Sequence, residues 1–313
     1  MNSNCSFGWI LLFLAGTWGA CRSEEPAKPK SEPVPLPETV AQDAKLKLEY
    51  EEKRFFESPV WDPKGEKLYF SSFGSKKSAY FMRLDETGKA SIWWEKTDGA
   101  GGAKVTADGR FLTTQAYAHR VTAYDFSPEG PLNPKILHTD ETLFQPNDLC
   151  LLANGDLYFT DPDFKGKTGS SVWHLSAGGK ATKVSTEMVL PNGIAASLDG
   201  KTLYVADSNR KHWKSFPIQA DGLLGAGKIF FAPEGESKND PDGMTIDARG
   251  NLYATGLGGV WVIAPDGKCL GLIPVPEFCS NAAFGGKDFT TLYLTCAQKV
   301  YSLEMNVAGG RAK

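Results

Sequence analysis

The chain has 313 residues, of which 41% are hydrophobic and 12% aromatic, so it is long and apolar enough to bury a sizeable core. Its formal net charge is −3 and its pI is about 5.9, which leaves no basic surface and excludes nucleic acid from the expected partners. The 33 glycines suit a fold with many tight turns.

The N-terminus resembles a secretory leader. An apolar run from Phe7 to Trp18 is too short to span a bilayer comfortably, and the small residues Gly19 and Ala20 follow it directly before Cys21. Residues 1–20 are therefore predicted to be a signal peptide that exports the protein to the periplasm or the cell surface. The segment also resembles a bacterial lipoprotein signal, which implies a lipidated Cys21 and a membrane tether. The alternatives are a leader cut after Ala20 without lipidation and an uncleaved anchor.

The segments on either side of the predicted domain have a composition that does not favour packing. Residues 21–44 are rich in Pro, Lys, Glu and Ser, which predicts an extended linker. Residues 306–313 are predicted to be a disordered tail. One folded domain is thus expected over residues 45–305.

Four cysteines follow Cys21 along the chain, and they match no zinc pattern because no CxxC occurs. Cys150 and Cys296 lie in apolar runs and are predicted to be core thiols. Cys269 and Cys279 are a candidate disulfide in an oxidising compartment, although the sequence alone leaves their pairing open.

Between these segments the chain repeats one pattern: a polar residue, an apolar run, a turn with glycine, and Leu-Tyr or its equivalent. The turn glycines recur every 44 to 50 residues, the length of a four-stranded propeller blade. Each unit contains short runs such as LYFSS, LYFTD and LYVAD, which are typical of strands. We therefore predict an all-β, six-bladed β-propeller, closed by pairing a strand near residues 49–56 with residues 300–303. An array of β-sandwiches is the alternative. The six units begin at Glu57, Gly101, Asn147, Asn192, Asp242 and Asn281.

The polar residue that opens each unit is the candidate functional position. Glu57, Asn147, Asn192 and Asp242 each stand eight residues before the turn glycine, and Asn281 holds the equivalent place in the last unit. In a propeller these positions surround one mouth of the central channel. Carboxylate and amide oxygens are ligands for a divalent cation, and the two acids would neutralise its charge. The alternative is that each residue simply forms a turn with its own backbone.

The segments around these positions resemble the signature segments of the gluconolactonase/regucalcin (SMP-30) family. The similarity extends over nearly all of residues 50–303. It implies a six-bladed propeller with one catalytic divalent cation, Ca²⁺ first, with Zn²⁺, Mn²⁺ or Mg²⁺ as alternatives. It also implies a hydrolase of carboxylic esters that opens a lactone ring, as a gluconolactonase does with a sugar lactone. The resembling segments are Glu57–Trp61, Pro146–Asp148, Pro191–Gly193 and Pro241–Met244.

The resemblance assigns Glu57, Asn192 and Asp242 as metal ligands, with Asn147 as a further ligand or a substrate contact beside the ion. The implied reaction is metal-assisted ester hydrolysis. Asp242 is then the candidate that takes a proton from the attacking water or orients that water.

The expected substrate-binding residues are Asn147, Gln145, His119 and Asn281. Gln145 occupies the place where the family commonly has an arginine that contacts the sugar, so a preference for aldonolactones stays open. His119 belongs to a segment that resembles a loop at the family's site entrance. Asn281 is expected to line the mouth, with a simple turn as the alternative.

Two other functions remain open on the sequence. One is a non-catalytic propeller that binds a protein or glycan, although such a module has no need for two acids facing each other across the axis. The other keeps the metal and hydrolyses phosphotriesters. No GxSxG occurs, which disfavours a serine esterase.

Overall fold

The structure is a computed structural model that describes residues 33–74, 78–106, 108–234 and 239–310. The predicted signal peptide, Cys21 and the first half of the predicted linker lie outside the described residues. The fold described below is that of residues 34–310. None of the described residues forms a helix that is long and apolar enough to span a bilayer.

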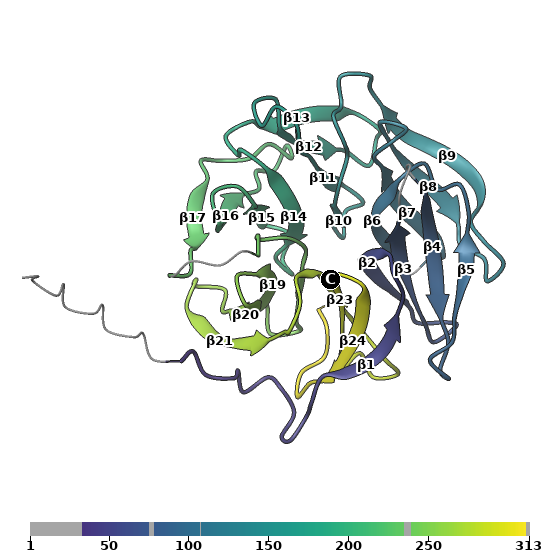
Figure 1. Cartoon of the computed structure of the whole chain (residues 1–313). Helices are drawn as coiled ribbons and strands as arrows, with labels where there is room; N and C mark the ends of the chain where they lie inside the picture. Colours follow the sequence, from purple (N-terminus) through teal and green to yellow (C-terminus); the bar gives the residue numbers. More distant parts are fainter. Residues whose placement is uncertain (1–32, 75–77, 107, 235–238, 311–313) are drawn as a thin grey trace, which may run out of the picture. The chain divides into compact units, whose positions relative to one another are not determined.

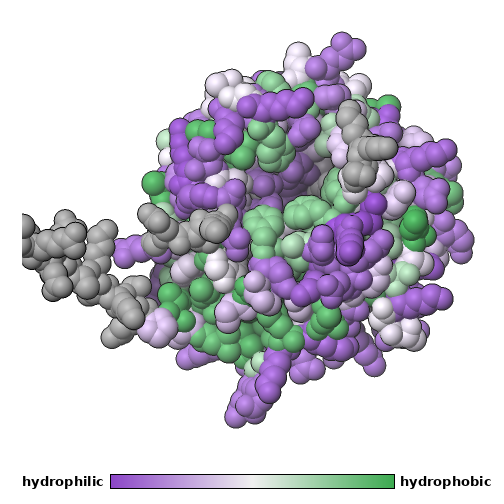
Figure 2. All heavy atoms as spheres, in the orientation of Figure 1, coloured by the Kyte–Doolittle hydropathy of each residue, from purple (hydrophilic) through white to green (hydrophobic). Residues whose placement is uncertain are grey.

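Six four-stranded antiparallel sheets surround a central channel, with one strand of each sheet lying innermost (Figure 1). The six-bladed all-β propeller expected from the repeat is therefore confirmed. In a space-filling view, this face of the molecule is hollowed near the centre of the ring (Figure 2). The first three blades comprise β2 (Phe55–Asp62), β3 (Lys67–Phe73), β4 (Ala79–Leu84) and β5 (Ala90–Trp94); β6 (Ala100–Val105), β7 (Arg110–Gln115), β8 (Arg120–Asp125) and β9 (Leu132–Thr139); and β10 (Leu149–Leu151), β11 (Leu157–Asp161), β12 (Ser171–Leu175) and β13 (Ala181–Ser185).

The next two blades follow in chain order, and the last blade takes its outermost strand from the start of the domain. These strands are β14 (Pro191–Ala196), β15 (Thr202–Asp207), β16 (His212–Pro217) and β17 (Lys228–Phe231); β18 (Met244–Ile246), β19 (Leu252–Gly256), β20 (Gly259–Ile263) and β21 (Cys269–Pro274); and β22 (Cys279–Gly285), β23 (Thr291–Cys296), β24 (Lys299–Glu304) and β1 (Lys47–Glu51).

The ring closes through β1, which pairs antiparallel with β24. Lys47 lies opposite Ser302, and Glu51 lies opposite Lys299. The expected closure is thus confirmed, with the closing strand starting slightly earlier than predicted. Joining the first strand to the last blade leaves only short, protected sheet edges.

The second strand of each blade carries the apolar signature of the repeat. Strands β11, β15 and β19 are almost wholly buried, because a neighbouring blade covers each of their faces. The turns before β7, β11, β15 and β19 require glycine at Gly109, Gly155, Gly200 and Gly250, whose φ angles are 85°, 88°, 66° and 86°. In the first blade Glu66, at φ 50°, takes the left-handed conformation instead of Gly65.

The hydrophobic core consists of six clusters, each lying between adjacent blades rather than in the centre of the ring. Phe81 and Trp93 of the first blade pack on Phe111 of the second, with ring centroids 5.2 Å apart in both pairs. Because apolar burial is satisfied between the blades, polar side chains can lie along the axis.

The predictions of a flexible linker and a flexible tail are wrong for the parts of these segments that the structure describes. In residues 34–44, expected to be linker, the Pro35 carbonyl accepts a hydrogen bond from Leu272 N at 2.9 Å, and Val40 is buried. In the expected tail, residues 306–310 are bound to the blades: Gly309 N donates to the Phe289 carbonyl at 2.8 Å. Both segments cover exposed backbone of the last two blades, which composition alone does not reveal.

The four described cysteines are all free thiols. Cys150 and Cys296 are buried, as predicted for core residues. Cys279 lies directly opposite Cys296 across β22 and β23, so its neighbouring thiol is not Cys269. The candidate disulfide between Cys269 and Cys279 is therefore not formed.

Candidate active site

The five repeat residues lie at the same end of the innermost strands. Glu57 belongs to β2, Asn192 to β14 and Asn281 to β22, while Asn147 and Asp242 each stand two residues before β10 and β18. The register of β2, β14 and β22 with its neighbour is irregular at these positions, which is where a strand turns a side chain away from the ladder.

Three carboxyl groups share the desolvated space near the axis. Burial raises the pKa of Glu57 to about 7, and repulsion from Asp148 contributes. Burial also raises the pKa of Asp242 well above its usual range, with Glu57 and Asp148 adding further repulsion. The pKa of Asp148 is itself raised by burial. Such a group of acids favours a bound positive charge.

Asp148 is the residue that the sequence reading missed. It lies inside the Pro146–Asp148 segment used for the resemblance, but it was given no role. A signal was present: the residue after the repeat position is small in the other blades, as at Gly193, Gly243 and Ala282, and acidic only here.

Glu57 is held in place by its neighbours. Its Oε2 accepts hydrogen bonds from the Ser58 backbone N–H at 2.5 Å, from Ser58 Oγ at 2.8 Å and from Asn281 Nδ2 at 3.1 Å. Asn281 Oδ1 accepts a bond from Ala282 N at 2.8 Å. The Asn281 amide, expected to contact substrate, is thus engaged with protein groups and orients Glu57.

Asn192 presents an unpaired oxygen. Its Nδ2 donates to Ser208 Oγ at 3.1 Å, and that hydroxyl donates to the Pro241 carbonyl at 2.6 Å. Its Oδ1 is buried and accepts no hydrogen bond from any described residue. A buried carbonyl without a partner costs about 1–3 kcal/mol. A cation would satisfy this oxygen, so the residues fit the implied metal.

Hydroxyl groups fix the backbone of the site-bearing segments from the blade before. Thr114 Oγ1 donates to the Asn147 carbonyl at 2.5 Å, and Thr160 Oγ1 donates to the Asn192 carbonyl at 2.7 Å. Ser280 Oγ likewise donates to the Phe56 carbonyl at 2.8 Å, next to Glu57. These bonds link successive blades at the level of the site.

Glycines allow the blades to meet closely at this level. A Cβ on Gly193 would clash with the carbonyl of Asp242 in the next blade. A Cβ on Gly102 would lie 2.5 Å from Asp148 Cα and 2.7 Å from Asp148 Oδ1. Gly101 and Gly102 therefore leave no open space at the axis, because the backbone of the third blade lies against them.

Gln145 lies in the loop between β9 and β10, and His119 contacts the same loop. His119 is exposed, and its Nδ1 is 2.6 Å from the Leu143 carbonyl. Gln145 is held through its backbone N–H, which donates to Asp161 Oδ1 at 2.8 Å. Burial raises the pKa of Asp161 to about 6. The structure brings the two expected substrate contacts to the same segment and gives neither a hydrogen bond to the three carboxyl groups.

In the described part of the chain, no group of three or more His, Cys, Asp or Glu side chains has the arrangement of a metal site. The expected ligand set depends partly on the Asn192 and Asn147 amides, which lie outside those residue types.

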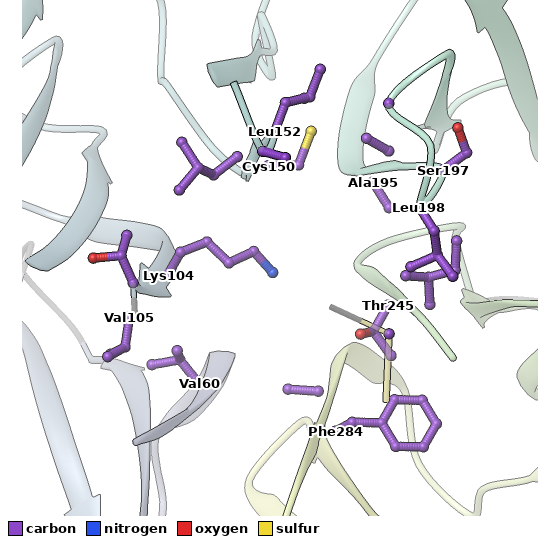
Figure 3. A pocket seen from close by; sticks show the side chains of 18 of the residues that line it. Val60, Lys104, Val105, Cys150, Leu152, Ala195, Ser197, Leu198, Thr245 and Phe284 are labelled. Atoms are coloured by element: carbon purple, nitrogen blue, oxygen red, sulfur yellow. The ribbon is translucent and has the colours of Figure 1, made fainter. Parts of the chain in front are cut away.

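A cavity of about 1240 Å³ lies further along the channel (Figure 3). It is lined by residues that follow the site on the inner strands, including Cys150 and Ile194, and by turns at the far ends of the blades. None of the five repeat residues lines it. Its walls are largely apolar, and Lys104 extends into it.

Comparison with known proteins agrees with this architecture. Residues 55–298 match the family model described as SMP-30/Gluconolactonase/LRE-like region. The chain is 29% identical over 289 residues to a gluconolactonase of Zymomonas mobilis, covering 81% of this chain and 79% of that protein. It is 25% identical over 249 residues to the pentonolactonase XacC of Haloferax volcanii, covering 78% and 82%.

Solved structures show the same fold. The structure of XC5397 from Xanthomonas campestris, described as a gluconolactonase, superposes with a TM-score of 0.74 at 26% identity. The match covers 85% of this chain and 91% of that one.

Proposed function

The chain belongs to the SMP-30/gluconolactonase/LRE-like family, and on that premise we propose that it is a carboxylic ester hydrolase that opens lactone rings with one divalent cation. Relatives named gluconolactonase and pentonolactonase support the reaction class. The observation that carries the cation is the group of three carboxyl groups, those of the buried Asp148 and Asp242 and the half-buried Glu57, together with the unpaired Asn192 Oδ1.

Glu57, Asn192 and Asp242 would hold the cation, with Asn147 as a further ligand or a contact to the substrate beside it. Calcium is the first candidate, because all these donors are hard oxygens. When bound, the cation polarises the lactone carbonyl and stabilises the negative charge that develops on its oxygen.

The chain's own residues supply position and proton transfer. Asp242 accepts a proton from the attacking water or orients that water. Asn281 and Ser58 keep the Glu57 carboxylate in one orientation through the bonds on Oε2. Gln145 is neutral where the family commonly has an arginine, so this site is proposed to accept lactones that do not require a cationic side chain.

The test is hydrolysis of gluconolactone, an aryl lactone and an organophosphate by the full chain. The hydrolysis rate of each substrate is measured after the protein is treated with chelator, and again after Ca²⁺, Zn²⁺, Mn²⁺ or Mg²⁺ is added back. We expect lactone turnover to vanish with chelator, to return with metal, and to fall at least ~100-fold in Asp242→Ala and Glu57→Ala. Glu86→Ala, which alters an exposed acid, is the matched control. Full activity in either site variant would refute the proposal, and turnover of the organophosphate alone would change the reaction class.

From the sequence alone we also propose that the protein is exported and tethered through a lipid on Cys21. Mass spectrometry of the mature N-terminus tests this directly. A diacylated Cys21 is expected, and a free N-terminus without lipid would contradict the tether.

A further inference from the structure

Lys104 lies on the innermost strand of the second blade, two residues after Gly102. Side chains two residues apart point to the same face of a strand and stand roughly 7 Å apart along it. At Gly102 that face meets Asp148 Oδ1 of the third blade. The pairing of β6 with β7 is irregular between Ala100 and Ala103 but regular from Ala103 to Lys104. Because Ala103 packs against the first blade, the Lys104 side chain leaves the strand on the opposite side, that of the third blade and Asp148, one step deeper along the channel.

The Lys104 ammonium is unpaired among the residues that the structure describes. It forms no salt bridge with any residue that the structure describes. The other charged side chains around the cavity are at its outer rim, where Arg110 pairs with Asp108 at 2.9 Å and Asp199 is exposed. Figure 3 shows the Lys104 side chain extended into the cavity.

The negative charge on which Lys104 acts belongs to Asp148, one of the three carboxyl groups. The positive charge of Lys104 opposes the rise in the pKa of Asp148 that burial causes. It also acts on Cys150, two residues further along the third blade, where it lowers the pKa of a thiol that burial raises. Both effects place the ammonium within electrostatic reach of Asp148 and Cys150.

The charges of these groups sum to a definite total. Glu57, Asp148 and Asp242 carry three negative charges when ionised, and a divalent cation would neutralise two. One negative charge remains. Among the described residues that line the cavity, Lys104 is the only cationic side chain away from the exposed rim.

We propose that Lys104 is a charge-balancing residue that sets the valence preference of the cation site, so that a divalent ion completes a neutral centre. This inference rests on the proposed function, because it presupposes a cation at the three carboxyl groups. Lys104 touches no reacting atom. It acts in two ways. Its positive charge repels ions of higher valence, and it offsets the third carboxylate. Without that offset, the surplus negative charge would weaken the ability of the divalent ion to polarise a substrate oxygen.

Coulomb repulsion by Lys104 grows in proportion to the charge of the bound ion. Removing the ammonium should therefore make the binding free energy of both ions more favourable. The gain for a trivalent ion should be about 1.5 times the gain for a divalent ion. If Ca²⁺ affinity rises on the order of tenfold, Tb³⁺ affinity rises about 30-fold.

The experiment measures Ca²⁺ and Tb³⁺ dissociation constants of the chelator-treated full chain by calorimetry and terbium luminescence. The variants are Lys104→Met and Lys104→Gln, with Lys104→Arg retaining the charge. Lys64→Met, which removes an exposed lysine, is the matched control. Both neutral variants of Lys104 should bind both ions more tightly, with the larger gain for Tb³⁺, while calcium-dependent lactone turnover falls at saturating Ca²⁺. The Lys104→Arg and Lys64→Met variants should behave as the unaltered protein.

Equal or absent affinity changes in both neutral variants would overturn the role of Lys104 and leave the proposed function standing. An unaltered protein that binds neither ion would instead overturn the proposed function, and the role of Lys104 with it.

Discussion

Replacing Glu57 with glutamine should stabilise the protein when no cation is bound. The substitution keeps the shape of the side chain and an oxygen that accepts the bonds from Ser58 and Asn281. It removes one of three desolvated negative charges that repel one another. The site residue is thus expected to lower stability in the absence of its ligand.

The magnitude follows from the pKa of Glu57, which burial and Asp148 raise from 4.5 to about 7. Each pKa unit corresponds to about 1.4 kcal/mol, so ionising Glu57 in the folded chain costs about 3 kcal/mol. Because the folded pKa is the higher one, the stability that Glu57 contributes is fully present below about pH 4.5 and is lost as the pH rises through about 7.

Urea unfolding in chelator measures this effect. At about pH 8 the free energy of unfolding of Glu57→Gln should exceed that of the unaltered protein by about 2–3 kcal/mol, and the difference should vanish near about pH 4. With saturating Ca²⁺ the order should reverse, because only the unaltered protein gains binding energy. A Glu57→Gln variant that is less stable in chelator at the higher pH, or equally stabilised by Ca²⁺, would refute the reasoning.

Two further substitutions test how the blades hold the site. Thr160→Val removes the hydroxyl that bonds the Asn192 carbonyl and should cost about 1–3 kcal/mol of unfolding free energy, with weaker cation binding; unchanged values in both assays would contradict the role of this bond. Gly193→Ala places a Cβ against the Asp242 carbonyl and should cost more than about 3 kcal/mol, whereas Gly178→Ala, which meets only Ser176 Oγ at 3.8 Å, should be neutral by thermal melting. Equal melting temperatures for the two glycine variants would show that the blades can separate at the site.

The repeat allowed the fold to be predicted from the sequence. Turn glycines such as Gly155 and Gly200 are needed because the backbone of each turn has a positive φ angle. This requirement depends only on the turn itself, so the spacing of these glycines gives the blade length. The repeat position also selected Glu57 and Asp242, which the structure places in electrostatic contact. Pseudo-symmetry turns one local pattern into a global arrangement, which explains why these features could be predicted.

The features that were missed depend on contacts between distant segments. Asp148 breaks the repeat rather than following it, so a search for what the blades share passes over it. Gly102 carries no sign in the sequence that Asp148 fills the space beside it. Residues 306–310 are mostly small and give no sign of packing in the sequence. They pack against the last blades because backbone groups there are free to form hydrogen bonds with them.

The central claim is that Glu57, Asn192 and Asp242 bind one divalent cation on the axis. A crystal structure of the calcium-soaked protein tests it most directly. The account predicts a single ion about 2.3–2.6 Å from a carboxylate oxygen of Glu57, a carboxylate oxygen of Asp242 and Asn192 Oδ1. A fully soaked crystal with no ion at these oxygens, or with Asn192 Oδ1 turned to a protein donor instead, would contradict it.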